Sequence, residues 1–150
     1  MLEALDGSAL REIVTGHREQ LGLCRTLELI ADTLPNEVDP ALCKAAAGCI
    51  QRVMTKVVQV EQEALASDLA ARGPKRVFDL TATLDRLLRE NEEDLCYAEE
   101  LQETLRELGD GRRTVSTDAL GYMLRGFFEL RRRRIALERE ILSAMAVPSP

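Results

Sequence analysis

The stretch that decides the fold is GYMLRGFFELRRRRIALEREIL, residues 121–142. Its apolar residues recur every three or four positions, which is the spacing of one face of an α-helix. Because a helix turns by about 100° per residue, four consecutive arginines cannot all face solvent on an amphipathic helix. We therefore expect one of these arginines to point toward the interior of the protein.

The composition favours the same structural class. The chain has 150 residues, of which 45% are hydrophobic, 31% are charged and only 3% are aromatic. Leu, Ala, Glu and Arg are frequent, and all four are good helix formers, whereas the residues that strands favour are scarce. The length suits one domain with a real core. The sequence therefore predicts a single all-α domain over residues 1–150.

Charge and hydropathy argue against two classes of partner. A net charge of −6 disfavours nucleic acid, because a nucleic-acid binder needs a basic face. The chain has no run of about 18 apolar residues, and MLEALDGSAL at the N-terminus is unlike a signal sequence. We therefore expect no membrane association and a cytoplasmic location. The cysteines lack C-x-x-C spacing and are expected to be small core residues of a reduced protein: Cys24, Cys43, Cys49 and Cys96.

Helix-ending and helix-starting residues divide the chain into four similar lengths. Pro35 ends the first helix, and Asp39 followed by Pro40 is a typical start of the second. Further breaks are expected at Gly73 and Pro74, at Gly109, and at Ser116 or Thr117. The predicted helices span about residues 8–34, 40–72, 75–108 and 117–146. Long helices joined by short loops predict an antiparallel up-down four-helix bundle.

Each predicted helix has an apolar stripe, and each stripe has polar interruptions near its middle. In a bundle, inward-facing polar residues on facing helices are how metal and cofactor sites are built. The ordinary alternative for any one of them is an edge residue whose polar end reaches water. These interruptions are His17, Glu61, Asn91, Arg134 and Glu138.

Four strings of the sequence resemble the helices of bacterial hemerythrin-like proteins, the HHE cation-binding domain family. They are HREQLGLCRTLELIADTLPN (17–36), VVQVEQEALASDL (57–69), RLLRENEEDLCYAEELQETL (86–105) and the stretch 121–142. The resemblance covers about residues 10–146. It implies a hemerythrin-like four-helix bundle, which in the family holds two iron ions through histidines and carboxylates and binds oxygen or senses oxygen or redox state.

Compared position by position, the resemblance implies a depleted metal site. His17 matches the ligand of the first helix, and Glu61 and Glu138 match acidic ligands of the second and fourth. The family's other histidine positions hold Val57, Asn91 and Arg134. Valine and arginine cannot bind iron, asparagine is a weak donor, and arginine repels a dication. His17, Glu61 and Glu138 are therefore expected to form a remnant site without a bound cofactor; iron or another divalent cation is the alternative.

Without a metal, two inward carboxylates would be costly to bury. Arg134 could supply a fixed positive charge between Glu61 and Glu138, with Asn91 and His17 completing the hydrogen bonds. We therefore predict an internal network of these five residues in place of the metal. The alternative is that Arg134 lies at the edge of the bundle. Residues 131–133 are expected to reach solvent, with Arg133 paired to Glu129 one turn earlier.

These expectations favour a non-enzymatic regulatory or protein-interaction module. Its partner would be an unidentified protein, with the basic cluster 131–133 and the acidic run 92–94 as candidate surfaces, and a homodimer is a further candidate. The first alternative is a metal-binding, oxygen- or redox-sensing protein with one ion at His17, Glu61 and Glu138, helped by Glu28 or Glu63.

The second alternative is a histidine phosphotransfer bundle with His17 as the phosphoryl acceptor, although His17 lies on the apolar stripe. No catalytic function is expected. The chain lacks a Gly-rich phosphate loop, a second histidine for a triad, and a Cys–His pair at a recognisable spacing.

Overall fold

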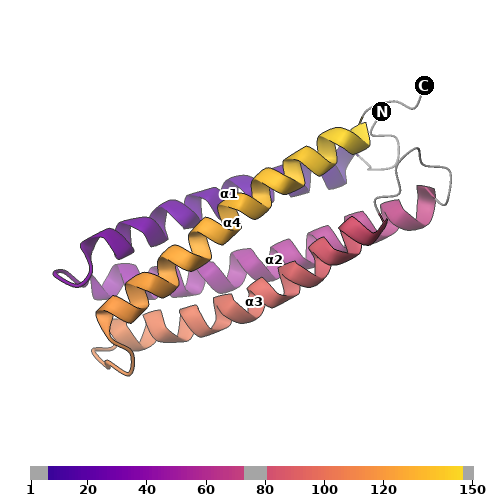
Figure 1. Cartoon of the computed structure of the whole chain (residues 1–150). Coiled ribbons are helices and arrows are strands. Elements are labelled where there is room, and N and C mark those ends of the chain that lie inside the picture. Colours follow the sequence, from indigo (N-terminus) through magenta and orange to yellow (C-terminus); the bar gives the residue numbers. More distant parts are fainter. Residues whose placement is uncertain (1–6, 73–80, 147–150) are drawn as a thin grey trace.

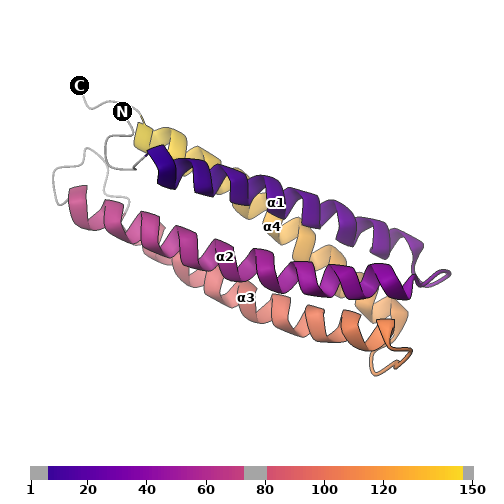
Figure 2. The same ribbon diagram turned by 180° about the vertical axis from the view of Figure 1, so that it is seen from behind.

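Four long helices run alternately up and down along one axis (Figures 1 and 2). The computed structural model describes residues 7–72 and 81–146. Its helices are α1 (Gly7–Thr33), α2 (Pro40–Arg72), α3 (Thr81–Gly109) and α4 (Thr117–Ala146). The predicted helix boundaries agree with these to within one residue, except that the predicted start of the third helix, at residue 75, lies outside the described residues. The expected antiparallel four-helix bundle is confirmed.

The start of α2 is fixed by Asp39 and Pro40. The Asp39 side chain accepts a hydrogen bond from the backbone N–H of Leu42 at 3.1 Å, which satisfies one of the free donors of the first turn. Pro40 is the first helical residue, where its missing N–H costs nothing. Ser116 caps α4 in the same way, accepting from the N–H of Ala119 at 3.1 Å.

Replacing Asp39 with alanine is expected to lower the free energy of unfolding by about 1 kcal/mol, since the cap is lost while the rest of α2 is unchanged. Urea unfolding followed by helical circular dichroism measures the loss. Glu37→Ala is the matched control, because it removes an exposed carboxylate from the same loop without removing a cap. Equal stabilities for the two variants would contradict the assignment of Asp39 as the cap.

The end of α3 is packed closely against the start of α2. A Cβ atom added at Gly109 would lie 2.7 Å from Lys44 Cγ and 3.1 Å from the carbonyl oxygen of Pro40. The turn then passes through Gly111, whose φ of +80° is a backbone conformation that favours glycine. Gly109 therefore lets the end of α3 approach α2, and Gly111 lets the chain turn between α3 and α4.

Each helix packs against two neighbours in the cyclic order α1, α2, α3, α4. The α2 and α3 backbones approach each other most extensively, and α3 and α4 least. Most of the apolar core lies in the half of the bundle that contains the α1–α2 and α3–α4 turns, where Leu27, Ile50, Leu101 and Leu124 are fully buried. A smaller apolar group lies toward the other end and includes Ile13, Leu84 and Ile141.

Between these two apolar regions lies a layer of buried polar side chains contributed by all four helices. We call it the polar layer; it consists of His17, Gln20, Glu61, Asn91, Asp94, Arg131 and Glu138. Burying so many polar groups is tolerable only when they bind one another. The polar layer is therefore the natural place to look for a functional site.

The exposure of several apolar side chains and cysteines is set by the inward face of each helix. On α4 this face runs through Phe128, Arg131, Ile135 and Glu138, so Leu137 is 45% exposed. Of the cysteines, only Cys24 and Cys43 are core residues; Cys49 is half-buried and Cys96 is exposed, and all four are free thiols. None of the helices described over 7–72 and 81–146 is long and apolar enough to cross a membrane.

Candidate metal centre and its polar network

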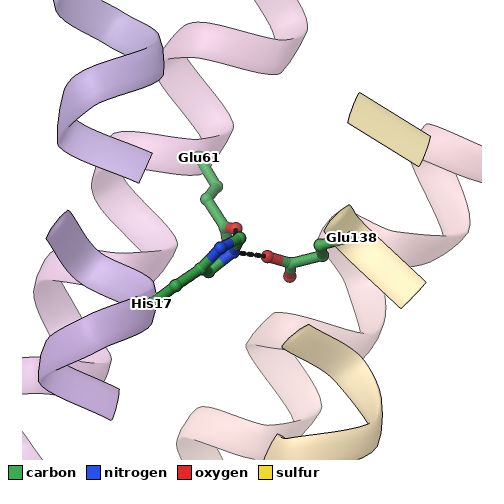
Figure 3. A group of neighbouring side chains, drawn as sticks. All are labelled: His17, Glu61 and Glu138. Atoms are coloured by element: carbon green, nitrogen blue, oxygen red, sulfur yellow. Dashed lines mark hydrogen bonds and ion pairs between the residues drawn. The ribbon is translucent and has the colours of Figure 1, made fainter. Parts of the chain in front are cut away.

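Three of the predicted site residues converge in the polar layer. His17 comes from α1, Glu61 from α2 and Glu138 from α4, and their side chains point toward one another (Figure 3). All three are buried, and one ligand-type atom of each lies within 4.8 Å of those of the other two. The structure therefore brings these three side chains together in the interior of the bundle.

The three side chains already contact one another without an ion. His17 Nε2 lies 2.6 Å from Glu138 Oε2 and 3.8 Å from Glu61 Oε1. Glu61 Oε2 accepts a hydrogen bond of 2.8 Å from the Asn91 side-chain amide. The second oxygen of Glu138, Oε1, has no hydrogen-bond partner, and it is the only such buried side-chain N or O atom among the described residues.

Burial and mutual contact shift the pKa of each of these groups. Burial alone lowers the pKa of His17, but hydrogen bonds and charge from Glu138 and Glu61 outweigh it and raise the value to about 9. Burial and the neighbouring Glu138 carboxylate raise the pKa of Glu61 to about 8. For Glu138, the effect of burial is outweighed by the neighbouring Glu61, by the hydrogen bond with His17 and by the positive charges of Arg131 and His17, so its pKa is lowered.

These pKa shifts determine which of the three side chains carry a proton near neutral pH when no metal is bound. His17 carries a proton and a positive charge, Glu138 is ionised, and Glu61 is protonated and neutral. The three groups together are then electrically neutral, which is the favourable condition for a buried cluster. A cation would have to displace protons from this cluster, because metal ligands must be deprotonated.

The arginine that enters the interior is Arg131. It is 1% exposed, and its guanidinium donates to Asp94 at 2.6 Å, to Asn91 Oδ1 at 3.0 Å and, from two nitrogens, to Gln20 Oε1 at 2.6 and 3.1 Å. Every acceptor is itself buried. A chain of hydrogen bonds therefore runs from Asp94 through Arg131 and Asn91 to Glu61.

The predicted place of Arg134 in a network with Glu61 and Glu138 is wrong. Arg134 lies at the edge of the bundle with its side chain 10% exposed, and it pairs with Asp94 at 2.9 Å and with Glu90. The expected alternative, an edge position, is the one that the structure shows.

Helix geometry explains this error. At about 100° per residue, Arg131 is offset from Glu138 by only about 20° around the helix, and Arg134 by about 40° in the opposite sense. Both residues therefore lie near the inward direction defined by Glu138. Acceptors on α1 and α3, Gln20 and Asn91, decide which arginine is buried.

One residue in each of the two candidate partner surfaces is buried, contrary to expectation: Arg131 and Asp94 form an ion pair with each other. Glu92 and Glu93 are exposed. Arg132 lies over the Phe128 ring and pairs with Glu28 at 2.8 Å. The remaining arginine of the run, Arg133, is exposed and pairs with Glu129 at 3.5 Å as predicted.

The acids suggested as extra ligands do not reach the centre. Glu28 is engaged by Arg132, and Glu63 is exposed; neither belongs to the group that could hold an ion. Sequence reasoning missed Gln20, which contacts Arg131. Its position three residues after His17, one helical turn along the same face, is the signal that could have identified it.

The donors present do not fit two iron ions. The chain contains a single histidine, and a guanidinium interacts with Asn91, one of the positions where the resemblance implies a histidine. One divalent ion fits better. Donors about 2.1 Å from one ion lie roughly 3–4 Å apart, close to the present separations of 2.6 and 3.8 Å.

Two further observations favour a single ion. The unpartnered Glu138 Oε1 offers a lone pair that nothing else uses. A cavity of about 10 Å³ adjoins Glu61 and Glu138 and is otherwise lined by apolar side chains such as Leu84 and Ile141, which is roughly the space of one water molecule. A water there could complete the coordination of an ion.

Four antiparallel helices around an interior cluster of a histidine and two carboxylates form an arrangement that could hold a metal ion. Comparison with protein families agrees: the model of the hemerythrin HHE cation binding domain matches residues 8–146. The chain therefore belongs to the hemerythrin HHE family. Neither the search of curated proteins nor that of solved structures gave a match.

Proposed function

We propose that this protein is a non-enzymatic member of its family that binds one divalent cation between His17, Glu61 and Glu138. The observation that carries the proposal is the convergence of three buried ligand atoms beside an oxygen, Glu138 Oε1, that has no partner. A bound cation would link α1, α2 and α4, so its arrival or loss would change the stability of the bundle. Such a change is suited to regulation through a protein partner or a second copy of the chain.

A mixed set of one imidazole and two carboxylates suits Mn²⁺, Fe²⁺ or Zn²⁺ better than Ca²⁺ or Mg²⁺, which prefer oxygen alone. The two carboxylates can balance the charge of a dication once Glu61 has lost its proton. Asp94 lies 2.6 Å from Arg131 and offsets much of its positive charge, which limits the repulsion between Arg131 and a cation.

Titration calorimetry of chelator-treated protein with Mn²⁺ and Zn²⁺ at pH 8 is expected to give one ion per chain. His17→Gln should weaken binding on the order of 100-fold, since even outer-shell partners cost 10- to 100-fold. Glu63→Gln is the matched control, because Glu63 lies two residues from Glu61 but is exposed. Absence of binding to wild-type protein at millimolar Mn²⁺, Fe²⁺ and Zn²⁺ would reject the proposal.

The second candidate function is that of a regulatory or protein-interaction module that binds no metal. It is supported by the existing bonds from His17 to Glu138 and from Asn91 to Glu61, which satisfy most of the cluster. Elemental analysis of protein purified without chelator separates the two candidates. A phosphotransfer role is disfavoured, because His17 is 1% exposed and a phosphoryl donor has to reach the acceptor.

A further inference from the structure

We propose that Arg131 is a positioning residue that sets the orientation of the Glu61 carboxyl group through Asn91. The inference deepens the proposed function and rests on it where cation affinity is concerned. It starts from a continuous path of short contacts: Arg131 to Asn91 Oδ1 at 3.0 Å, and Asn91 Nδ2 to Glu61 Oε2 at 2.8 Å.

The chemistry of the guanidinium group fixes which way the Asn91 amide faces. A guanidinium group can only donate hydrogen bonds, so Arg131 must meet the amide oxygen of Asn91. The amide nitrogen then points the opposite way, toward Glu61. If Arg131 were absent, the amide could turn over and present its oxygen to Glu61, which is a poor match for the ionised carboxylate that would bind a cation.

Arg131 itself is held from three sides. Gln20 on α1 accepts from two of its nitrogens, while Asp94 and Asn91 on α3 accept from a third. The fixed position of the guanidinium sets the orientation of the Asn91 amide. The amide in turn donates a hydrogen bond to Glu61 Oε2. The other oxygen, Oε1, is left facing His17 Nε2 at 3.8 Å, which is the direction in which the proposed cation would lie.

The choice of variant separates the effect of the positive charge of Arg131 from the effect of its hydrogen-bonding geometry. Arg131→Lys keeps the positive charge, but a single ammonium group cannot span Gln20, Asn91 and Asp94 as a planar fork does. Asn91→Leu has a similar volume and removes the amide itself. Arg134→Lys is the matched control, because Arg134 bonds to Asp94 and Glu90 on α3, the helix that carries Asn91, but forms no hydrogen bond with Asn91.

The first measurement is Mn²⁺ affinity of folded, chelator-treated protein at pH 8. We expect Arg131→Lys and Asn91→Leu each to weaken binding about 10-fold with one ion per chain retained, and Arg134→Lys to change it less than two-fold. The double variant should be no weaker than either single variant, because both act along one path. A double variant weakened about 100-fold, or equal losses in Arg131→Lys and Arg134→Lys, would overturn the inference.

The second measurement does not need a cation. In the metal-free protein the side-chain NH₂ of Asn91 donates to a buried carboxyl group, so its protons should exchange slowly with solvent by NMR. Exchange should accelerate at least about 10-fold in Arg131→Lys and stay unchanged in Arg134→Lys. Unchanged exchange in both variants would overturn the inference. If wild-type protein binds no Mn²⁺ but this pattern is seen, the proposed function fails and the positioning role of Arg131 stands.

Discussion

Replacing Arg131 with methionine is expected to lower the free energy of unfolding by about 3 kcal/mol. Methionine fills much of the same volume but donates no hydrogen bond, so the side-chain oxygens of Gln20 and Asn91 lose their partner. Asp94 keeps Arg134 as a counter-ion, which limits the loss. Urea unfolding at pH 7 measures the difference from wild type.

Arg133→Met is the control for removing one arginine of the same run. Arg133 has a side chain that is 79% exposed and a single surface pair with Glu129, so its loss should cost no more than about 0.5 kcal/mol. If the two variants unfold at the same urea concentration, the guanidinium of Arg131 contributes nothing through its buried contacts.

The metal-free protein is expected to become less stable as the pH rises from 6 to 8.5. Glu61 has a pKa raised to about 8 in the folded protein, so its stabilising contribution is present at low pH and is lost between about 4.5 and 8. His17, with a pKa raised to about 9, loses its contribution between about 6.5 and 9. Both groups therefore act in the same direction over this range.

The size of this effect should be on the order of several kcal/mol, since each pKa unit is worth about 1.4 kcal/mol. Glu138, whose pKa is lowered, acts only below about pH 4.5 and does not oppose the trend. Urea midpoints at pH 6 and 8.5 in the presence of chelator measure it. In Glu61→Gln the decline should be clearly shallower, whereas Glu63→Gln should follow the wild type.

Adding a cation should counteract this loss of stability at high pH. Binding displaces the protons of His17 and Glu61, so it strengthens as the pH rises. Saturating Mn²⁺ is therefore expected to raise the unfolding midpoint more at pH 8.5 than at pH 6. A metal-free profile that rises with pH would contradict the assigned protonation of the cluster.

Local sequence signals were enough to predict the helices and much of the site. Asp39, Pro40 and Gly109 mark helix ends by chemistry that acts within a few residues. His17 and Glu61 stand on clear apolar stripes, so their inward direction follows from helical periodicity alone. The resemblance to the family was needed to predict that these residues lie together at one site.

The choice between Arg131 and Arg134 depended on information that a single helix does not carry. Both arginines lie close to the inward direction of α4, and each can form an ion pair. What separates them is how α1 and α3 are rotated, because that rotation brings Gln20 and Asn91 to Arg131. Such rotations are set by packing over the whole bundle, and periodicity in one segment does not report them.

The polar layer has a consequence for the alignment of the helices along the bundle axis. Apolar side chains can pack against many different apolar partners. A purely apolar bundle therefore loses little stability when one helix slides by one turn, about 5.4 Å. In this bundle such a slide of α4 would separate Arg131 from Asp94 and Glu138 from His17 at once. The polar layer therefore favours a single axial register of the four helices, as single buried polar residues do in coiled coils.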